Sequence, residues 1–338
     1  MVKLCDRCGA RPANYLRLSS GEALCLNCLF DLVENTVVKT IRRYRLIVEG
    51  DRVGIAISGG KDSLVLMYIL GKLRKLGRIP RNVELVAFSI DEGQPYSCVR
   101  RSNSADAVKR ISEEFNIEYR VYALKDLLGV SALEVAEGLW KKGLNTHMCT
   151  ICGVLRRRAM NIIGRELKLT KIATGHNLDD EAQTVVLNVL TNDVKRFAWF
   201  GAMPVNEVED FIPRIKPLRY VREEEVALYA YYHGIPLMTF ECPFVYNNPR
   251  YGLKFTIDEW EEDNPNVKYN IVSFGDQLAK IAGRHFSEGG FRLNRCKYCG
   301  FPTSGEVCRV CELVSEAGLM DKYMSHINRT AVSLRNSA

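Results

Sequence analysis

The sequence of 338 residues lacks long apolar runs, since the longest, over 64–70, is far too short to span a bilayer. Its first residues also lack the apolar stretch of a secretion signal, so we expect a cytoplasmic protein. It contains no low-complexity tract and no repeat of its central part. Neither sign of charge dominates: 47 Lys and Arg against 40 Asp and Glu leave a net charge of +7, which allows an anionic partner such as nucleic acid without requiring one.

Hydrophobic residues make up 47% of the chain, which suffices for a packed core and excludes general disorder. At roughly 150 residues per domain, the length indicates about two domains with small modules attached. Twelve cysteines are many for a protein of a reducing compartment. In such a compartment they indicate metal ligands or redox groups rather than disulfides.

Eight of these cysteines form two sets, each made of two CxxC pairs. The first set is Cys5, Cys8, Cys25 and Cys28, and the second is Cys296, Cys299, Cys308 and Cys311. Two close pairs of thiolates can meet around one tetrahedral ion, as in closed structural zinc sites. We therefore expect one Zn²⁺ in each set, with a four-thiolate iron site as the alternative because spacing does not select the metal.

Four cysteines remain outside these sets. Cys149 and Cys152 form a third CxxC motif without a second pair nearby, so they are either a redox pair or half of a metal site. Cys242 precedes a proline, which favours an extended chain. Cys98 has no partner at a recognisable spacing and is expected to be a small buried or half-buried residue.

Between the two sets, apolar strands alternate with amphipathic helices. We expect strands at 52–57, 83–90, 118–124 and 171–174, and helices at 64–76, 99–115, 154–167, 178–190 and 222–233. This alternation predicts an α/β fold with a doubly wound, mostly parallel sheet, flanked by the two four-cysteine modules. Ligands of such sheets bind at the carboxyl ends of the strands.

The segments outside this alternation are less regular in pattern. A basic helix over 37–47 is expected before the first strand, either as a solvated face or as an RNA contact. The stretch 251–290 is expected to be mainly helical, and the polar tail after Leu313 to be loosely held.

A glycine-rich loop, SGGKDS, follows the first predicted strand. It consists of Ser58, Gly59, Gly60, Lys61, Asp62 and Ser63. The glycines permit a tight turn that directs backbone N–H groups at an anion, and the following helix N-terminus favours negative charge. Lys61 and the serine hydroxyls can donate to phosphate oxygens, and the carboxylate of Asp62 in such a cradle indicates Mg²⁺. The loop fits neither the Walker A pattern nor G-x-G-x-x-G.

This loop resembles that of the PP-loop ATP pyrophosphatases, which cleave ATP to AMP and pyrophosphate while adenylating a carbonyl oxygen of the substrate. Three further motifs make the resemblance specific: CTICGVLRRR over 149–158, TGHNLDD over 174–180, and ECP over 241–243. With the flanking four-cysteine sets, they resemble the tRNA 2-thiolation group, which modifies wobble or T-loop uridines. The resemblance covers almost the whole chain and implies an ATP-dependent tRNA sulfurtransferase.

The resemblance implies that Cys149, Cys152 and Cys242 hold a [4Fe–4S] cluster. Three thiolates for four irons leave one iron open to bind a sulfide. The alternative is a redox mechanism in which Cys149 or Cys152 carries a persulfide that Cys242 resolves. The group receives sulfur as free sulfide or from a ubiquitin-like carrier thiocarboxylate, and its members are often dimers.

The resemblance also assigns catalytic roles. Arg156 shares a helix face with Cys152 and is expected to stabilise charge on the α-phosphate as pyrophosphate leaves. Alternatively, Arg156, Arg157 and Arg158 form a basic face for tRNA phosphates. Asp180 matches an acid expected to act as an Mg²⁺ ligand or a proton acceptor.

Other residues near the strand ends are expected around the nucleotide. Gly175 permits close approach of the backbone to ATP, and Ala56 and Ile90 are expected beside adenine. Asp179 is a candidate cap for the following helix. His176 is interpreted as a positioned structural histidine rather than as a general base.

The implied chain organisation has four parts: a zinc module at 1–33, a PP-loop ATP-binding catalytic domain with the iron–sulfur site at 34–250, a helical extension at 251–290, and a zinc module with a tail at 291–338. In the implied reaction, the uridine C2 oxygen attacks the α-phosphate of MgATP, pyrophosphate leaves, and sulfide then displaces AMP. Two other functions stay open: a PP-loop ligase or amidotransferase acting on a small molecule, and a non-catalytic zinc-ribbon RNA-binding protein.

The position of the target uridine is indicated by small differences between the two thiolase types. Cys28 as the fourth ligand, together with 153–158 and 91–93, resembles the wobble enzymes. The stretches 175–181 and 300–305 resemble the T-loop enzymes instead. We interpret the balance as favouring the wobble uridine.

Overall fold

The computed structural model describes residues 3–203, 211–237, 242–246, 248–288 and 293–336. A five-stranded parallel sheet forms its centre, in the order β5-β4-β3-β6-β7. The strands are β3 (Arg52–Ile57), β4 (Glu84–Asp91), β5 (Glu118–Ala123), β6 (Lys171–Ala173) and β7 (Arg214–Ile215). The predicted parallel sheet is thus confirmed, with one short additional strand, β7, that two residues could not reveal by periodicity.

Helices cover both faces of the sheet, which explains why its central strands β3 and β4 are largely apolar. Val53, Ile55 and Ile57 of β3 pack into one layer, while Val86 and Phe88 of β4 pack into the other. The first layer contains α1 (Leu26–Tyr44), α2 (Lys61–Lys75), α3 (Pro95–Phe115) and α9 (Glu223–Tyr232). The second contains α4 (Leu124–Leu128), α5 (Ala132–Lys141), α6 (Met148–Glu166), α12 (Arg309–Glu316) and α13 (Met320–Asn336).

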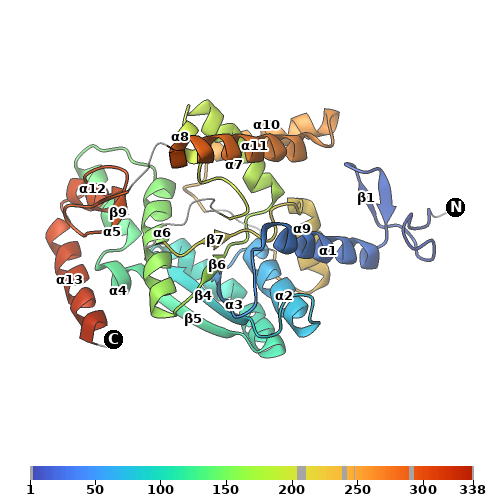
Figure 1. Ribbon diagram of the computed structural model, residues 1–338, viewed down its shortest axis with the longest axis horizontal. Helices are drawn as coiled ribbons and strands as arrows, with labels where there is room; N and C mark the ends of the chain where they lie inside the picture. The colour runs from blue at the N-terminus through green and yellow to red at the C-terminus, as the bar shows by residue number, and fades with distance from the viewer. Residues whose placement is uncertain (1–2, 204–210, 238–241, 247, 289–292, 337–338) are drawn as a thin grey trace.

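A third group of helices packs together around α7, at the top of the view in Figure 1. It consists of α7 (Leu178–Leu190), α8 (Val194–Phe197), α10 (Pro249–Asp263) and α11 (Val267–Glu288). The mainly helical character predicted for 251–290 is therefore confirmed for the described residues of that stretch. No helix in the described part of the chain combines the length and the apolar character that a membrane crossing needs.

The two four-cysteine modules lie at opposite ends of the molecule (Figure 1). The N-terminal module carries the hairpin β1 (Tyr15–Arg17) and β2 (Glu22–Leu24), and the C-terminal one carries β8 (Asn294–Arg295) and β9 (Pro302–Thr303). The expectation of a loose tail after Leu313 is wrong, because Val314, Ala317 and Tyr323 are buried against the second helical layer.

Several helices begin earlier along the chain than the sequence predicts. The α2 helix starts at Lys61, inside the glycine-rich loop motif, and α6 starts at Met148, so that its CxxC motif is helical. The predicted basic helix over 37–47 corresponds to the second half of α1, which begins after Cys25 and ends at Tyr44, so 45–47 lie beyond the helix. Each of these shifts places a motif residue in the first turn of a helix.

Candidate functional site

The strand order places two of the predicted motifs at one point of the sheet. After β3 the chain continues to β4 and β5 on one side, whereas β6 lies on the other side of β3. Such a reversal of strand order opens a crevice at the carboxyl ends of the two strands. The glycine-rich loop follows β3, and the segment with Gly175 follows β6, so both motifs meet at this point.

The glycine-rich loop forms a closed turn. Gly59 adopts a φ of 81°, a left-handed conformation that favours glycine, and Gly60 is the N-cap of α2. Ser63 Oγ accepts from Ser58 N at 3.2 Å and donates to the carbonyl of Gly60 at 2.8 Å. The loop is thereby held in place at the start of α2, where free backbone N–H groups can receive a phosphate.

Lys61 connects this loop to two acids. Its Nζ lies 3.2 Å from Asp62 Oδ2 and 2.8 Å from Glu223 Oε1, at the start of α9. Glu223 also pairs with Lys254 of α10 at 2.9 Å. Burial opposes ionisation of Glu223, but the charges and hydrogen bonds of Lys61 and Lys254 together outweigh it and lower the pKa of Glu223 to about 2. Glu223 carries no signal in the sequence, because a pair between such distant positions leaves no spacing pattern.

Asn177 links the two acids assigned to catalysis. Its amide Nδ2 donates to Asp62 Oδ1 at 3.0 Å, and its Oδ1 accepts from Asp180 N at 3.1 Å. In return, Asn177 N donates to Asp180 Oδ2 at 3.2 Å, which completes a capping box for α7. Burial and then the charge of Asp62 raise the pKa of Asp180 to about 7. A divalent cation beside these carboxylates would relieve that repulsion, so the residues fit Mg²⁺.

The expectation that Asp179 caps α7 is wrong, because Asn177 takes that position. Asp179 is buried instead, pairs with Lys268, and accepts from the backbone N of Glu223 at 2.8 Å. It therefore anchors the start of α9 and, with it, the side chain that holds Lys61. His176 contacts Thr174 Oγ1 through Nδ1 at 2.9 Å, as a positioned histidine would.

Gly175 packs against the glycine-rich loop itself. A Cβ added at Gly175 would lie 2.8 Å from Ser63 N and 2.9 Å from the carbonyl carbon of Asp62. The backbone after β6 therefore touches the loop after β3. Ala56 and Ile90, the residues predicted beside adenine, are half-buried members of the second layer on the same face of the sheet; their contact with adenine stays a prediction.

The third CxxC motif lies at the beginning of α6. Cys152 is buried and accepts from Gln94 Nε2 at 3.7 Å, and Cys149 Sγ lies 3.6 Å from the carbonyl oxygen of Phe244, two residues after Cys242. Burial, reinforced by the charge of Glu92, raises the pKa of Cys152 to about 12. The chain thus brings Cys242 to the motif from a position some ninety residues later.

These three cysteines differ from the two four-cysteine sets in spacing. In each four-cysteine set, the four sulfurs lie within 4.8 Å of one another, whereas Cys149, Cys152 and Cys242 form no such compact group among the described residues. Compact sulfurs suit a single tetrahedral ion. A four-iron cluster is wider than a single ion and takes its ligands further apart, so the less compact arrangement of these three cysteines fits a [4Fe–4S] cluster.

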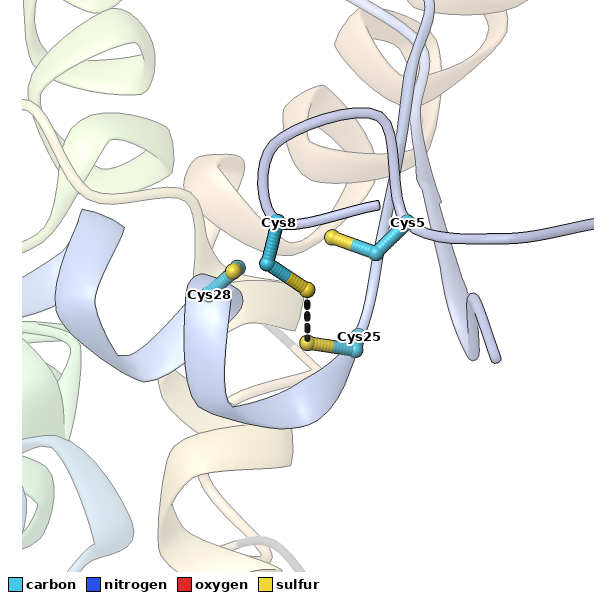
Figure 2. Close-up of side chains that lie close together, drawn as sticks. All are labelled: Cys5, Cys8, Cys25 and Cys28. Carbon is cyan, nitrogen blue, oxygen red and sulfur yellow. Dashed lines mark hydrogen bonds between the residues drawn. The ribbon is translucent and has the colours of Figure 1, made fainter. Parts of the chain in front are cut away.

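The two compact sets share one local construction. Cys8 Sγ lies 3.8 Å from Cys25 Sγ in the N-terminal set, whose sulfurs face a common centre (Figure 2), and Cys299 Sγ lies 3.7 Å from Cys308 Sγ in the other. In both sets, a glycine with positive φ follows the first pair, and the second pair opens a helix. These residues therefore fit one structural metal ion in each set.

The three consecutive arginines of α6 face three different surroundings. Arg156 Nε donates to Glu92 Oε1 at 2.6 Å beside the three-cysteine site, and 42% of its side chain is exposed. Arg157 is exposed, and Arg158 is buried against Cys299 of the C-terminal module. The alternative of one basic face made by all three is therefore wrong, because successive helical residues diverge by about 100°. The side chain of Cys98 and the residue Glu241 lie outside the described part.

Comparison with known proteins agrees with this geometry. Residues 33–241 match the family model of the PP-loop domain. The chain is 37% identical to the tRNA 2-thiolation protein NcsA of Haloferax volcanii, over 92% of this chain and 98% of that protein. It is 33% identical to the cytoplasmic tRNA 2-thiolation protein 1 of Oryza sativa, over 92% and 82%. The solved structure of the U34-tRNA thiolase NcsA from Methanococcus maripaludis with its [4Fe–4S] cluster superposes with a TM-score of 0.75 and 32% identity, covering 93% of this chain and 97% of that one.

Proposed function

Because the chain belongs to the tRNA 2-thiolation group of the PP-loop family, we propose that it converts the wobble uridine of tRNA to 2-thiouridine after adenylating its C2 oxygen with ATP. One observation carries the proposal: the glycine-rich loop, the linked pair Asp62 and Asp180, and the three-cysteine site lie around the carboxyl ends of β3, β4 and β6. The name of the rice relative further supports a cytoplasmic location.

The wobble position is supported by two features. The solved relative is a U34-tRNA thiolase, and position 34 is the wobble nucleotide of the anticodon. The fourth ligand of the N-terminal set is Cys28, as in the wobble enzymes, rather than the histidine of the T-loop enzymes.

The loop over 58–63 receives the triphosphate of ATP in this proposal. Lys61 and the N-terminus of α2 supply positive charge, and Asp62 would hold Mg²⁺, which would neutralise charge on the phosphate oxygens. Arg156, oriented by Glu92, is exposed enough to reach the α-phosphate as pyrophosphate leaves. Adenylation then turns the C2 oxygen of the uridine into part of a good leaving group, AMP.

Asp180 is assigned the proton transfer. When the C2 oxygen attacks the α-phosphate, the N3–H of the uridine loses its proton, which a nearby base must accept. A carboxylate with a pKa near 7 can accept that proton and release it again near neutral pH. Asn177 orients Asp180 through the capping box and Asp62 through its amide.

The sulfur step is assigned to Cys149, Cys152 and Cys242. They would hold a [4Fe–4S] cluster, which would supply a bound sulfide at the iron that has no protein ligand. The raised pKa of Cys152 argues against a free nucleophilic thiolate there, and so against the persulfide alternative for that residue. The sulfur donor is proposed to be free sulfide or the thiocarboxylate of a ubiquitin-like carrier, and a dimeric state is also proposed.

Anaerobically purified protein tests the proposal. Incubated with a tRNA transcript, ATP, Mg²⁺ and sulfide, it should contain about four irons per three-cysteine site, release AMP and pyrophosphate only with tRNA, and form 2-thiouridine in the anticodon fragment. The Cys242→Ala variant should lose iron and thiolation, while Cys98→Ala keeps both.

Thiolation in the T-loop fragment would overturn the wobble assignment. Adenylation of small molecules without tRNA would favour the ligase alternative, and failure to bind ATP would favour the RNA-binding one.

A further inference from the structure

Four arginines from four different elements gather around one of them, Arg157, which lies on α6 five residues after Cys152. They are Arg157 of α6, Arg196 of α8, Arg214 of β7 and Arg250 of α10. The charges of the other three all act on Arg157, which shows that they share one region. The guanidinium of Arg157 folds back along α6, with its nitrogens 3.8 and 3.9 Å from the Cβ position of Gly153, the residue after Cys152.

The fold holds two of these arginines together through Asn161. Its Nδ2 donates to the backbone carbonyl of Arg157 at 2.9 Å, and its Oδ1 accepts from the backbone N of Ile212 at 3.0 Å. Ile212 lies two residues before Arg214, which pairs with Ile172 in the β6–β7 ladder. One buried amide therefore sets the position of α6 relative to β7.

The third arginine is fixed by a hydroxyl group. Arg250, in the first turn of α10, donates through Nη2 to Thr184 Oγ1 of α7 at 2.8 Å. Only Arg196 has an acidic partner, Asp193, at 2.8 Å, among the described residues.

A structural arginine elsewhere in the protein is neutralised differently. Arg219 is fully buried and pairs with Glu181 at 3.0 Å and with Asp276 at 2.6 Å. In the described part of the chain, no carboxylate pairs with Arg157, Arg214 or Arg250. Gathering cations without acids costs electrostatic free energy, which an external anion would offset. The arrangement is therefore that of a surface for a polyanion.

We infer that Arg157, Arg196, Arg214 and Arg250 bind the phosphodiester backbone of the tRNA substrate on either side of the target uridine. The inference rests on the proposed function, because it takes the polyanion to be tRNA. Guanidinium groups can bind phosphate oxygens with two parallel hydrogen bonds. Such contacts fix the position of an RNA without reading its sequence, so that the uridine is brought to the site between the loop and the cysteines.

The test compares two double variants with equal loss of charge. The first is Arg157→Gln with Arg214→Gln. The control is Arg81→Gln with Arg120→Gln: Arg81 lines a surface pocket just before β4, and Arg120 lies exposed on the edge strand β5. The affinity for an unmodified tRNA transcript is measured over a series of KCl concentrations, together with the affinity for a non-hydrolysable ATP analogue, the iron content and the melting temperature.

We expect the first variant to bind tRNA on the order of tenfold more weakly. We also expect the slope of log affinity against log salt to fall by about 1 to 2. Nucleotide affinity and iron content should stay unchanged, and the control should bind tRNA almost as the wild type does. Equal tRNA binding by both variants, or a loss of nucleotide binding alone, would overturn the inference and leave the proposed function intact if the wild type thiolates tRNA. A wild type that binds no tRNA would overturn both.

Discussion

The guanidinium of Arg158 donates through Nη2 to the sulfur of Cys299 at 3.5 Å. This contact joins α6, which carries Cys149, Cys152 and Arg156, to the C-terminal four-cysteine module. Arg158 is 7% exposed, and its guanidinium carbon lies 3.7 Å from the ring centroid of Phe301. Four thiolates around one divalent metal ion carry a net charge of −2, so the guanidinium of Arg158 has a counter-charge once the metal is bound. Through these contacts the C-terminal module packs against α6, the helix that carries two of the three cysteines of the candidate site.

Replacing Arg158 with Met should destabilise the protein by about 3 kcal/mol, because the thiolates lose a buried counter-charge. The metal of the C-terminal module should also leave faster when a chelator is added. Denaturation curves and the rate of metal release measure both effects. The matched control is Arg309→Met, since Arg309 lies exposed in the same module and, among the described residues, pairs only with Glu312. Equal stability and metal release in both variants would contradict the role given to Arg158.

The Asp180→Asn variant should keep the fold, because an amide oxygen can still accept from Asn177 N. Nucleotide binding in the presence of Mg²⁺ should persist, whereas pyrophosphate release with tRNA should fall by at least about 10²-fold, since the proton acceptor is lost. Equilibrium binding of an ATP analogue and a pyrophosphate assay separate these two effects. If nucleotide binding is lost as well, Asp180 is an Mg²⁺ ligand rather than a base.

The Gly175→Ala variant should weaken ATP binding on the order of tenfold. The added methyl group would lie 2.8 Å from the backbone N of Ser63, so the glycine-rich loop has to move. Gly252→Ala is the control, because a Cβ at that helical position meets nothing within 4 Å. Calorimetric titration with the ATP analogue gives both affinities; unchanged binding by Gly175→Ala would show that the loop does not receive the nucleotide.

The Glu223→Gln variant should lose about 1–2 kcal/mol of stability at neutral pH, an amount reduced by the partial exposure of the pair. The pKa of Glu223 in the folded protein is about 2, below its ordinary value of 4.5, so the ionised form favours folding. This contribution is complete above about pH 4.5 and disappears as the pH falls towards 2. Unfolding curves of both proteins at several pH values should therefore converge in acid; a constant difference would contradict the ion pair.

Much of the fold followed from periodicity. The strands β3 and β4 are largely apolar runs that carry their own signal, and the predicted boundaries of β3 to β6 match the structure within one residue. The start of α2 was predicted too late because Lys61 and Asp62 form a polar first turn. The start of α6 was also predicted too late, although Met148, Ile151 and Cys152 are buried at helical spacing. The two-residue strand β7 is defined only by its pairing with β6.

The residues of the candidate site fall into two classes. Cys5 to Cys28, Cys296 to Cys311 and the glycine-rich loop were recognisable because their chemistry requires close spacing along the chain. Glu92 and Glu223 were missed because each meets its cation from a distant segment.

The sequence by itself therefore determined the sheet, the metal-binding sets and the family, since local spacing and apolar periodicity encode them. Only the tertiary structure decided that Arg156, Arg157 and Arg158 lie in three different environments, and that Asn177 rather than Asp179 caps α7. The physical reason is the same in each case: a side chain's partner is set by the packing of elements distant in the chain, which leaves no pattern along the sequence.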